Sequence, residues 1–138
     1  MDDTDRHLVS LLRDNARLPV ATLAKRLGVS RGTVQNRIAR LIATGSIEGF
    51  TVRAKPDTGT IRAIMLIEIE GERSDRIVDE LKKFPEVRAV HTTNGRWDMV
   101  IELTTDSLQT FDRVLHRIRQ ITGVSASETS LLLSSYVF

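Results

Sequence analysis

The sequence predicts an α+β protein of two parts, and two patterns lead to this prediction. In the first half, apolar residues recur at helical spacing in three short segments. In the second half, residues 66–69 and 100–103 resemble each other, and each precedes an amphipathic helix and then a valine-bearing strand. The chain has 138 residues, 41% of them hydrophobic, which suits one ordinary domain or two small ones.

Charge is distributed unevenly along the chain. The formal net charge is only +2, yet residues 1–60 hold ten Lys or Arg and six Asp or Glu, while residues 61–138 hold ten and twelve. The stretch from Lys25 to Arg40 has five basic residues and no acidic one. A basic first half suits a polyanion such as nucleic acid, whereas the second half does not.

Composition also excludes several classes of protein. With no cysteine, the chain has no disulfide framework, thiolate–zinc site or cysteine nucleophile. No apolar run approaches the ~20 residues of a membrane span, and the first residues lack the layout of a signal peptide. We therefore expect a cytoplasmic protein. We expect no metal site, because His7, His91 and His116 share no metal-ligand spacing.

Three short helices are predicted in the first half. The first has a leucine face behind an acidic start. The second is predicted over about residues 20–27, with Pro19 at its first helical position and Gly28 in the left-handed conformation that ends it. Ser30 is expected to cap the third helix, and residues 47–52 are expected to form a short strand. The apolar stripe of the third helix consists of Val34, Ile38, Leu41 and Ile42.

The short Gly-containing turn between the second and third helices is typical of a helix-turn-helix. The outward face of the third helix strengthens this interpretation, because it carries groups that bind base edges and phosphates. Arginine pairs with guanine through two hydrogen bonds, and Asn or Gln pairs similarly with adenine. The alternative is a three-helix bundle with an ordinary polar exterior. The predicted DNA-binding residues are Ser30, Arg31, Thr33, Gln35, Asn36, Arg37 and Arg40.

The order of elements in the second half predicts a ferredoxin-like βαββαβ domain. Its first helix is predicted over about residues 74–84 and its second over about residues 107–121. Asp106 is the expected N-cap of the second helix, with Gln109 as the return half of a capping box.

The predicted first strand of this domain is apolar on both faces. Met65 and Ile67 alternate with Ile64 and Leu66, whereas an antiparallel sheet with one face in water should alternate between apolar and polar residues. We therefore predict that a second copy covers the free face, so that the protein forms a dimer sheet against sheet.

Short motifs across nearly the whole chain resemble the Lrp/AsnC family of transcription regulators. The resemblance implies a winged helix-turn-helix in residues 1–50, a linker in 51–60, and a ferredoxin-like effector-binding and oligomerisation domain in 61–138. It implies a DNA-binding regulator, not an enzyme, whose dimers assemble to tetramers or octamers and respond to a small effector, usually an amino acid, with no cofactor. The matching segments are Asp5-Arg6, Asn15-Ala16-Arg17, Leu23-Ala24, Val29-Ser30, Arg37-Ile38, Leu41, residues 45–50, Pro85-Glu86-Val87, residues 95–98, Gly123-Val124 and Thr129-Ser130.

In that family the effector site is built from a Gly-x-x-Asp turn and the loop leading into the last strand, at a contact between dimers. Asp98 is then expected to hold the ammonium group of an amino acid, while backbone N–H groups near Gly95 and hydroxyl groups hold its carboxylate. A purely structural alternative stays open for each residue, since Asn-Gly is a hairpin signal and Asp suits a turn. The effector-binding residues that the resemblance implies are Asn94, Gly95, Arg96, Asp98, Ser127, Thr129 and Ser130.

Three other functions were weighed against this interpretation. An enzyme is disfavoured because the chain has no Gly-rich phosphate loop, nucleophile elbow or zinc motif. An amino-acid sensor that does not bind DNA leaves the basic helix unexplained. An architectural protein that compacts DNA stays open, and footprinting separates it from a regulator with defined sites.

Overall fold

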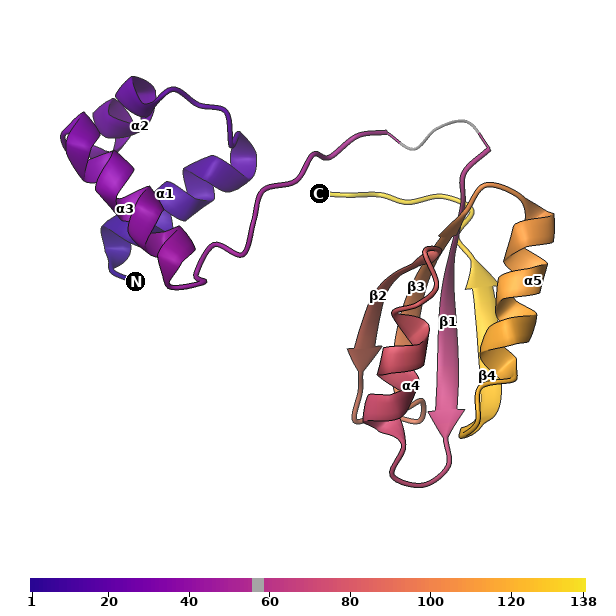
Figure 1. Cartoon of the computed structure of the whole chain (residues 1–138). Helices are drawn as coiled ribbons and strands as arrows, with labels where there is room; N and C mark the ends of the chain where they lie inside the picture. The colour runs from indigo at the N-terminus through magenta and orange to yellow at the C-terminus, as the bar shows by residue number, and fades with distance from the viewer. Residues whose placement is uncertain (56–58) are drawn as a thin grey trace. The chain divides into compact units, whose positions relative to one another are not determined.

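The structure is a computed structural model that describes residues 1–55 and 59–138 (Figure 1). Its contacts divide the chain into two compact units, Met1–Ala54 and Lys55–Phe138, and each is described by itself. The linker predicted over residues 51–60 includes residues 56–58, which lie outside the described residues.

The first unit contains the predicted helices. Asp2 caps the first of them by accepting a hydrogen bond from the Asp5 backbone N–H at 2.8 Å. Gly28 adopts φ +67° and ends the second, and Ser30 caps the third by accepting from the Thr33 N–H at 3.1 Å, as the sequence predicts. The helices are α1 (Asp3–Asp14), α2 (Val20–Leu27) and α3 (Arg31–Ala43).

The core of this unit forms where the apolar faces of the three helices meet. Leu8, Leu23 and Val34 are almost fully buried, one from each helix. One predicted member of the α3 stripe is wrong, because Ile42 is 49% exposed. It lies one position past Leu41, which already points into the core, and the core ends there.

Two further predictions in this unit are corrected. Pro19 is the N-cap of α2 rather than its first residue, a shift of one position that its fixed φ accommodates. Residues 47–52 form no strand. The Ile47 N–H instead donates to the Leu41 carbonyl at 2.9 Å, and its side chain packs on the helical core. A strand needs a neighbouring strand for its backbone groups, and residues 1–55 contain none.

The second unit has the predicted βαββαβ order, with all strand pairs antiparallel. The strand order β2-β3-β1-β4 places the first and third strands at the centre, as in the ferredoxin-like fold. Both helices cover the same face of the sheet (Figure 1). The elements are β1 (Ile61–Ile69), α4 (Ser74–Leu81), β2 (Val87–Thr92), β3 (Met99–Thr105), α5 (Leu108–Arg119) and β4 (Val124–Leu131).

The ends of both helices differ from the prediction. α4 ends at Leu81, and Phe84 lies in the following turn, where its N–H donates to the Leu81 carbonyl at 3.1 Å. The N-cap of α5 is Ser107 rather than Asp106, because the Ser107 hydroxyl accepts from the Thr110 N–H at 3.1 Å. With Ser107 as the N-cap, the third helical position is Thr110 rather than Gln109, so the predicted capping box does not form.

The two faces of the sheet are buried to different degrees. Met65 and Ile67 of β1 face the helices and are fully buried, whereas Ile64 and Leu66 on the other face are half-buried. Val100 of β3 pairs with Leu66 and adds to this second apolar face. Among the described residues, no helix is long and apolar enough to cross a membrane.

Candidate functional site

The exposed face of α3 carries most of the predicted DNA-binding residues. Val34 and Leu41 hold the opposite face of this helix in the core. Gly32 at the helix start has open space around its Cα, which leaves room for close approach by a partner. Thr33 is half-buried, and its hydroxyl lies 2.8 Å from the hydroxyl of the capping residue Ser30. The predicted residues that are exposed are Ser30, Arg31, Gln35, Asn36 and Arg40.

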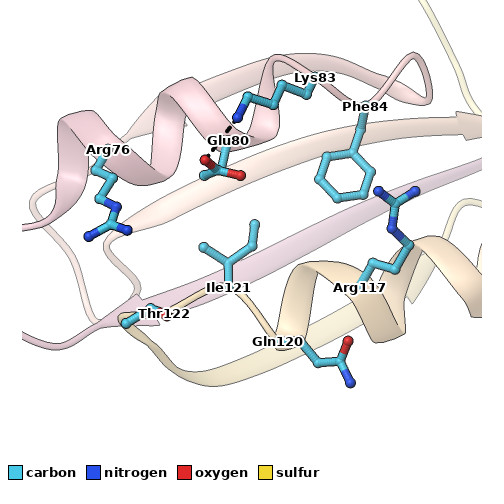
Figure 2. Close-up of a pocket in the computed structure, with 8 residues that line it drawn as sticks. All are labelled: Arg76, Glu80, Lys83, Phe84, Arg117, Gln120, Ile121 and Thr122. Carbon is cyan, nitrogen blue, oxygen red and sulfur yellow. Dashed lines mark hydrogen bonds and ion pairs between the residues drawn. The ribbon is translucent and has the colours of Figure 1, made fainter.

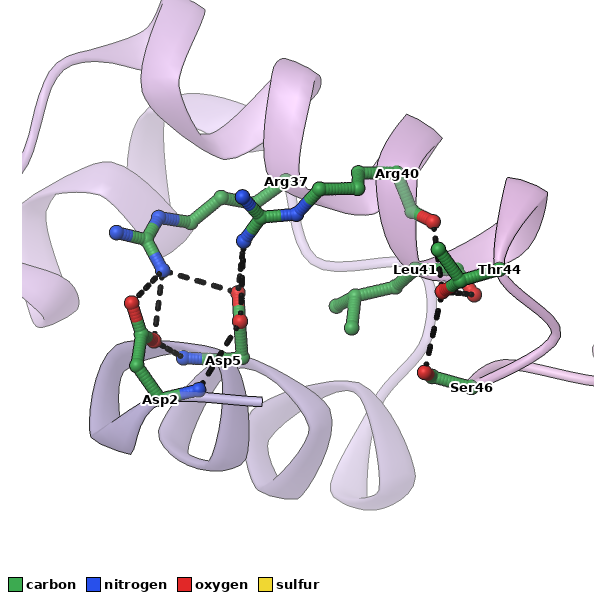
Figure 3. Close-up of polar contacts among 7 residues, drawn as sticks. All are labelled: Asp2, Asp5, Arg37, Arg40, Leu41, Thr44 and Ser46. Atoms are coloured by element: carbon green, nitrogen blue, oxygen red, sulfur yellow. Dashed lines mark hydrogen bonds and ion pairs between the residues drawn. The ribbon is translucent and has the colours of Figure 1, made fainter.

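Arg37 lies differently from the other arginines of α3. Its Nη1 donates to both carboxylate oxygens of Asp2 at 2.7 Å and to Asp5 at 3.0 Å (Figure 3). Arg40 also reaches α1, with Nη2 at 3.1 Å from Asp5. The side chain of Asp5 is 3% exposed, that of Arg37 is 23% exposed and that of Arg40 is 59% exposed. Asp5, Arg37, Arg40 and Asp2 thus form an ion-pair cluster between α1 and α3, here called the α1–α3 cluster.

This cluster changes the pKa of its members. The hydrogen bond from Arg37 lowers the pKa of Asp2 from 3.8 to about 2. Burial acts to raise the pKa of Asp5, but hydrogen bonds from Arg37 and from the Asp2 backbone outweigh it, so the pKa is lowered. Hydrogen bonds to the Asp2 and Asp5 carboxylates raise the pKa of Arg37. All three groups are therefore charged near neutral pH.

The loop between β2 and β3 carries the first group of predicted effector residues. The Thr93 N–H donates to the Asp98 carbonyl at 3.0 Å, so the loop spans residues 94–97. Asn94 has a negative φ and Gly95 is not in the left-handed region, so the tight Asn-Gly hairpin turn does not form. Arg96 stacks 4.5 Å above the Trp97 ring and forms an ion pair with Glu68 of β1.

Asp98 anchors this loop to the central strand. One of its oxygens, Oδ2, accepts from the Ile69 N–H at 2.7 Å, while its own N–H donates to the Ile67 carbonyl at 2.9 Å. The structural role that the sequence left open for Asp98 is therefore present. Within the described chain, the other oxygen Oδ1 has no hydrogen bond.

The β4 residues of the predicted site point to different faces of the sheet. Ser127 and Thr129 pair with Ile67 and Met65, so they lie on the helix-covered face. Arg119 of α5 donates to the Ser127 hydroxyl at 3.3 Å, and the buried Thr129 hydroxyl has no partner within the described residues. Ser130 lies on the other face.

One strand separates the two groups of predicted effector residues. β1 lies between β3 and β4, which places these strands about 10 Å apart at the usual strand spacing. The two groups therefore lie on either side of β1 within a single described chain. The resemblance implies a site at a contact between dimers, and the register of β4 determines which face of the sheet each of its residues occupies in one chain.

A separate cavity of about 390 Å³ lies between α4 and the end of α5 (Figure 2). Three of its charged groups have partners: Lys83 lies 3.0 Å from Glu80, and Arg117 stacks 4.7 Å above the Phe84 ring. None of the predicted site residues lines it. Among residues 1–55 and 59–138, no three His, Asp or Glu gather as metal ligands.

Comparison with known proteins identifies both units. Residues 1–42 match the AsnC-type helix-turn-helix domain, and residues 62–138 match the Lrp/AsnC ligand binding domain. A helix-turn-helix domain joined to a ligand-binding domain defines a transcriptional regulator. The chain belongs to the Lrp/AsnC family.

The relatives carry regulator names rather than enzyme names. The uncharacterized HTH-type transcriptional regulator PH1916 of Pyrococcus horikoshii is 35% identical over 94% of this chain and 90% of its own length. The HTH-type transcriptional regulator FL11 of Pyrococcus furiosus is 28% identical over 96% and 89%.

Solved structures agree with the fold. Escherichia coli AsnC superposes with a TM-score of 0.87 at 25% identity, over 100% of this chain and 95% of that chain. The regulator NMB0573 of Neisseria meningitidis, solved as a complex with L-Met, has a TM-score of 0.87 at 21% identity, over 100% and 93%. The sequence-based identification of the family, of the helix-turn-helix and of the ferredoxin-like domain is confirmed, whereas the described residues 1–55 contain no strand to form the implied wing.

Proposed function

We propose that this regulator recognises specific duplex DNA sequences through α3, and that a free amino acid controls its assembly and DNA binding. The observation that carries the proposal is the exposed face of α3, where Arg31, Gln35 and Asn36 point away from a core that fixes the helix. Gln35 and Asn36 supply paired donors and acceptors for adenine edges. Arg31 at the helix start supplies a phosphate or guanine contact.

The α1–α3 cluster holds Arg37 in ion pairs, whereas other basic residues of this unit are accessible. Arg31 is exposed, as are Lys25 and Arg26 at the end of α2. Arg40 is more than half exposed although it contacts Asp5. We propose that these accessible cations supply the salt-sensitive part of the affinity, because each phosphate they neutralise releases a counterion.

We further propose that the free face of the sheet binds the same face of a second copy. Ile64, Leu66 and Val100 form its apolar centre, and charged residues lie around them. Two recognition helices then enter successive major grooves of a roughly palindromic site, about 34 Å apart. Assembly of dimers to tetramers or octamers belongs to the same proposal.

An amino acid is the proposed effector. Asp98 uses one oxygen to hold the loop, and its second oxygen, which has no hydrogen bond within the described chain, is the proposed acceptor for the ammonium group. The split between the β2–β3 loop and β4 favours a site that is completed where dimers meet. The structure of NMB0573 with L-Met offers an example of an amino acid bound to a regulator with this fold.

Two measurements test the proposal. Selection from a random duplex library should enrich a defined site, and footprinting should protect a few helical turns there. Sequence-tolerant protection of any duplex would instead indicate an architectural protein. The twenty amino acids should include at least one that raises the melting temperature and changes the mass of the assembly. If none of the twenty amino acids has these effects, the effector proposal is contradicted and the DNA-binding proposal is not.

A further inference from the structure

The guanidinium group of Arg37 contacts carboxylates of the first turn of α1 and its N-cap rather than facing solvent. A single nitrogen, Nη1, contacts three carboxylate oxygens of Asp2 and Asp5. Its side chain is less than half as exposed as that of Arg40, which lies one turn further along α3. Figure 3 shows both guanidinium groups turned toward the first turn of α1.

Asp5 is the fixed point of the α1–α3 cluster. It is buried, and its carboxylate accepts from the Asp2 backbone N–H as well as from both arginines. A buried carboxylate is costly unless it is paired and hydrogen-bonded, so these bonds hold α3 at a set position on α1. A phosphate that bound Arg37 would have to replace two carboxylates and would leave Asp5 with Arg40 as its one remaining cation among the described residues.

We infer that Arg37 is a positioning residue, which fixes the orientation of α3 for base reading and does not contact DNA phosphates. This inference rests on the proposed reading of DNA by α3. It replaces the direct DNA contact that the sequence predicts for Arg37. The rival interpretation is that Asp2 masks Arg37 until a phosphate displaces it.

The two interpretations differ in the salt dependence of binding. A phosphate contact contributes about one unit to the slope of log affinity against log salt, and it acts on all sequences equally. A positioning residue leaves the slope unchanged. It acts on sequence discrimination, because base contacts need an aligned helix whereas phosphate contacts tolerate small rotations.

The first experiment compares Arg37→Met with Arg31→Met in the full chain. Binding is measured at several salt concentrations on a duplex selected by the wild-type protein and on a mixed-sequence duplex of equal length. We expect Arg37→Met to lower the ratio of selected to mixed affinity about tenfold with no change in slope. Arg31→Met should lower the slope by about one. A slope lowered by Arg37→Met, or a ratio it leaves unchanged, overturns the inference.

The second experiment uses Asp2→Asn with Asp3→Asn as its matched control. Asparagine keeps the N-cap and removes the charge, and among the described residues Asp3 pairs only with the exposed Arg6 on its own helix. We expect Asp2→Asn to lower the ratio severalfold, like Arg37→Met but less, and Asp3→Asn to leave it unchanged. Tighter binding of mixed-sequence DNA by Asp2→Asn than by Asp3→Asn would show masking and overturn the inference.

Two further variants keep the inference testable if Arg37→Met folds poorly. Arg37→Lys retains a cation between the carboxylates and should recover most of the sequence discrimination. The double variant Asp2→Asn/Arg37→Met should discriminate no worse than Arg37→Met alone, since both changes act on one contact. A further loss in the double variant contradicts the inference. A wild-type protein that binds neither duplex in dilute buffer contradicts the proposed function as well.

Discussion

The two units of this protein arrange their candidate residues in opposite ways. In the first unit, Arg31, Gln35 and Asn36 lie on one exposed face of a single helix. In the second, Ser127 and Ser130 lie on opposite faces of β4, and β1 separates them from the β2–β3 loop. Helical periodicity gathers neighbouring residues onto one face, whereas strand alternation divides them. A site on one helix is thus determined mainly by helical spacing, whereas a site across a sheet depends on strand register.

The largest effect is expected for a variant that tests whether a second copy covers the free face of the sheet. Leu66→Glu places a charge at the apolar centre of the free sheet face. We expect the dimer dissociation constant to rise at least a hundredfold, or about 3 kcal/mol, because burying an unpaired charge is costly. Light scattering at micromolar concentration measures this. Leu108→Glu, at an exposed leucine of α5, should leave the assembly unchanged. Equal behaviour of the two variants would argue against the sheet-to-sheet dimer.

The next effect concerns base reading by the first unit. Exchanging the side chains at two positions, Gln35→Asn with Asn36→Gln, keeps the charge and the functional groups while moving them by one methylene. We expect the ratio of affinities for the original and the newly preferred sequence to change about tenfold or more, since a paired base contact contributes about 1–3 kcal/mol. Affinity for mixed-sequence DNA should stay the same. Gln109→Asn, at an exposed position of α5, is the control. Uniform weakening on all sequences would speak against base contacts here.

A smaller effect is expected at the β2–β3 loop, where we propose that the effector binds. Asp98→Asn keeps an oxygen that accepts from the Ile69 N–H but removes the negative charge. We expect amino-acid binding to weaken about tenfold, because a charge-assisted bond is lost. DNA binding without amino acid should persist. Calorimetry measures the amino-acid affinity, and Asp112→Asn on the exposed face of α5 is the control. Unchanged amino-acid affinity would leave Asp98 with its loop-anchoring role alone.

The smallest effect is the acid stability of the first unit. Arg37 lowers the pKa of Asp2 from 3.8 to about 2. The Asp2 ion pair therefore contributes stability that is complete above about pH 4 and is lost as the pH falls toward 2. Thermal unfolding should show a drop of a few degrees over this window, reduced in Asp2→Asn and retained in Asp3→Asn. Identical acid profiles for the two variants would show that Asp2 contributes nothing measurable.

Sequence patterns predicted the parts of the fold that depend on near neighbours. Gly28 and Ser30 act within one turn of their own positions, and the structure confirms both roles. The N-cap of α5 was misplaced by one residue because Asp106 and Ser107 are both good caps, and only the helix register distinguishes them. The strand predicted over residues 47–52 has suitable side chains but no partner strand within residues 1–55.

The candidate sites show the same division. The stripe of α3 predicted most of the exposed side chains, yet it misassigned Ile42 and could not separate Arg37 from Arg40. Their difference comes from Asp2 and Asp5, which are more than thirty residues away. The acidic start of α1 was visible in the sequence as a helix-capping signal, and a search for acids facing α3 could have found the cluster. The directions of Ser127 and Thr129 depend on the β1–β4 register, which no local pattern encodes.

The bond between Asp98 and Ile69 has a mechanical consequence. Ile69 ends β1 and pairs with Val124 at the start of β4, beside the irregularity after Glu68. A ligand that draws the Asp98 carboxylate toward itself would also weaken its hydrogen bond with the Ile69 N–H at the end of β1. If an amino acid binds Asp98 as proposed, this bond and the pairing of Ile69 with Val124 connect the loop to the edge strand β4, with no hinge required.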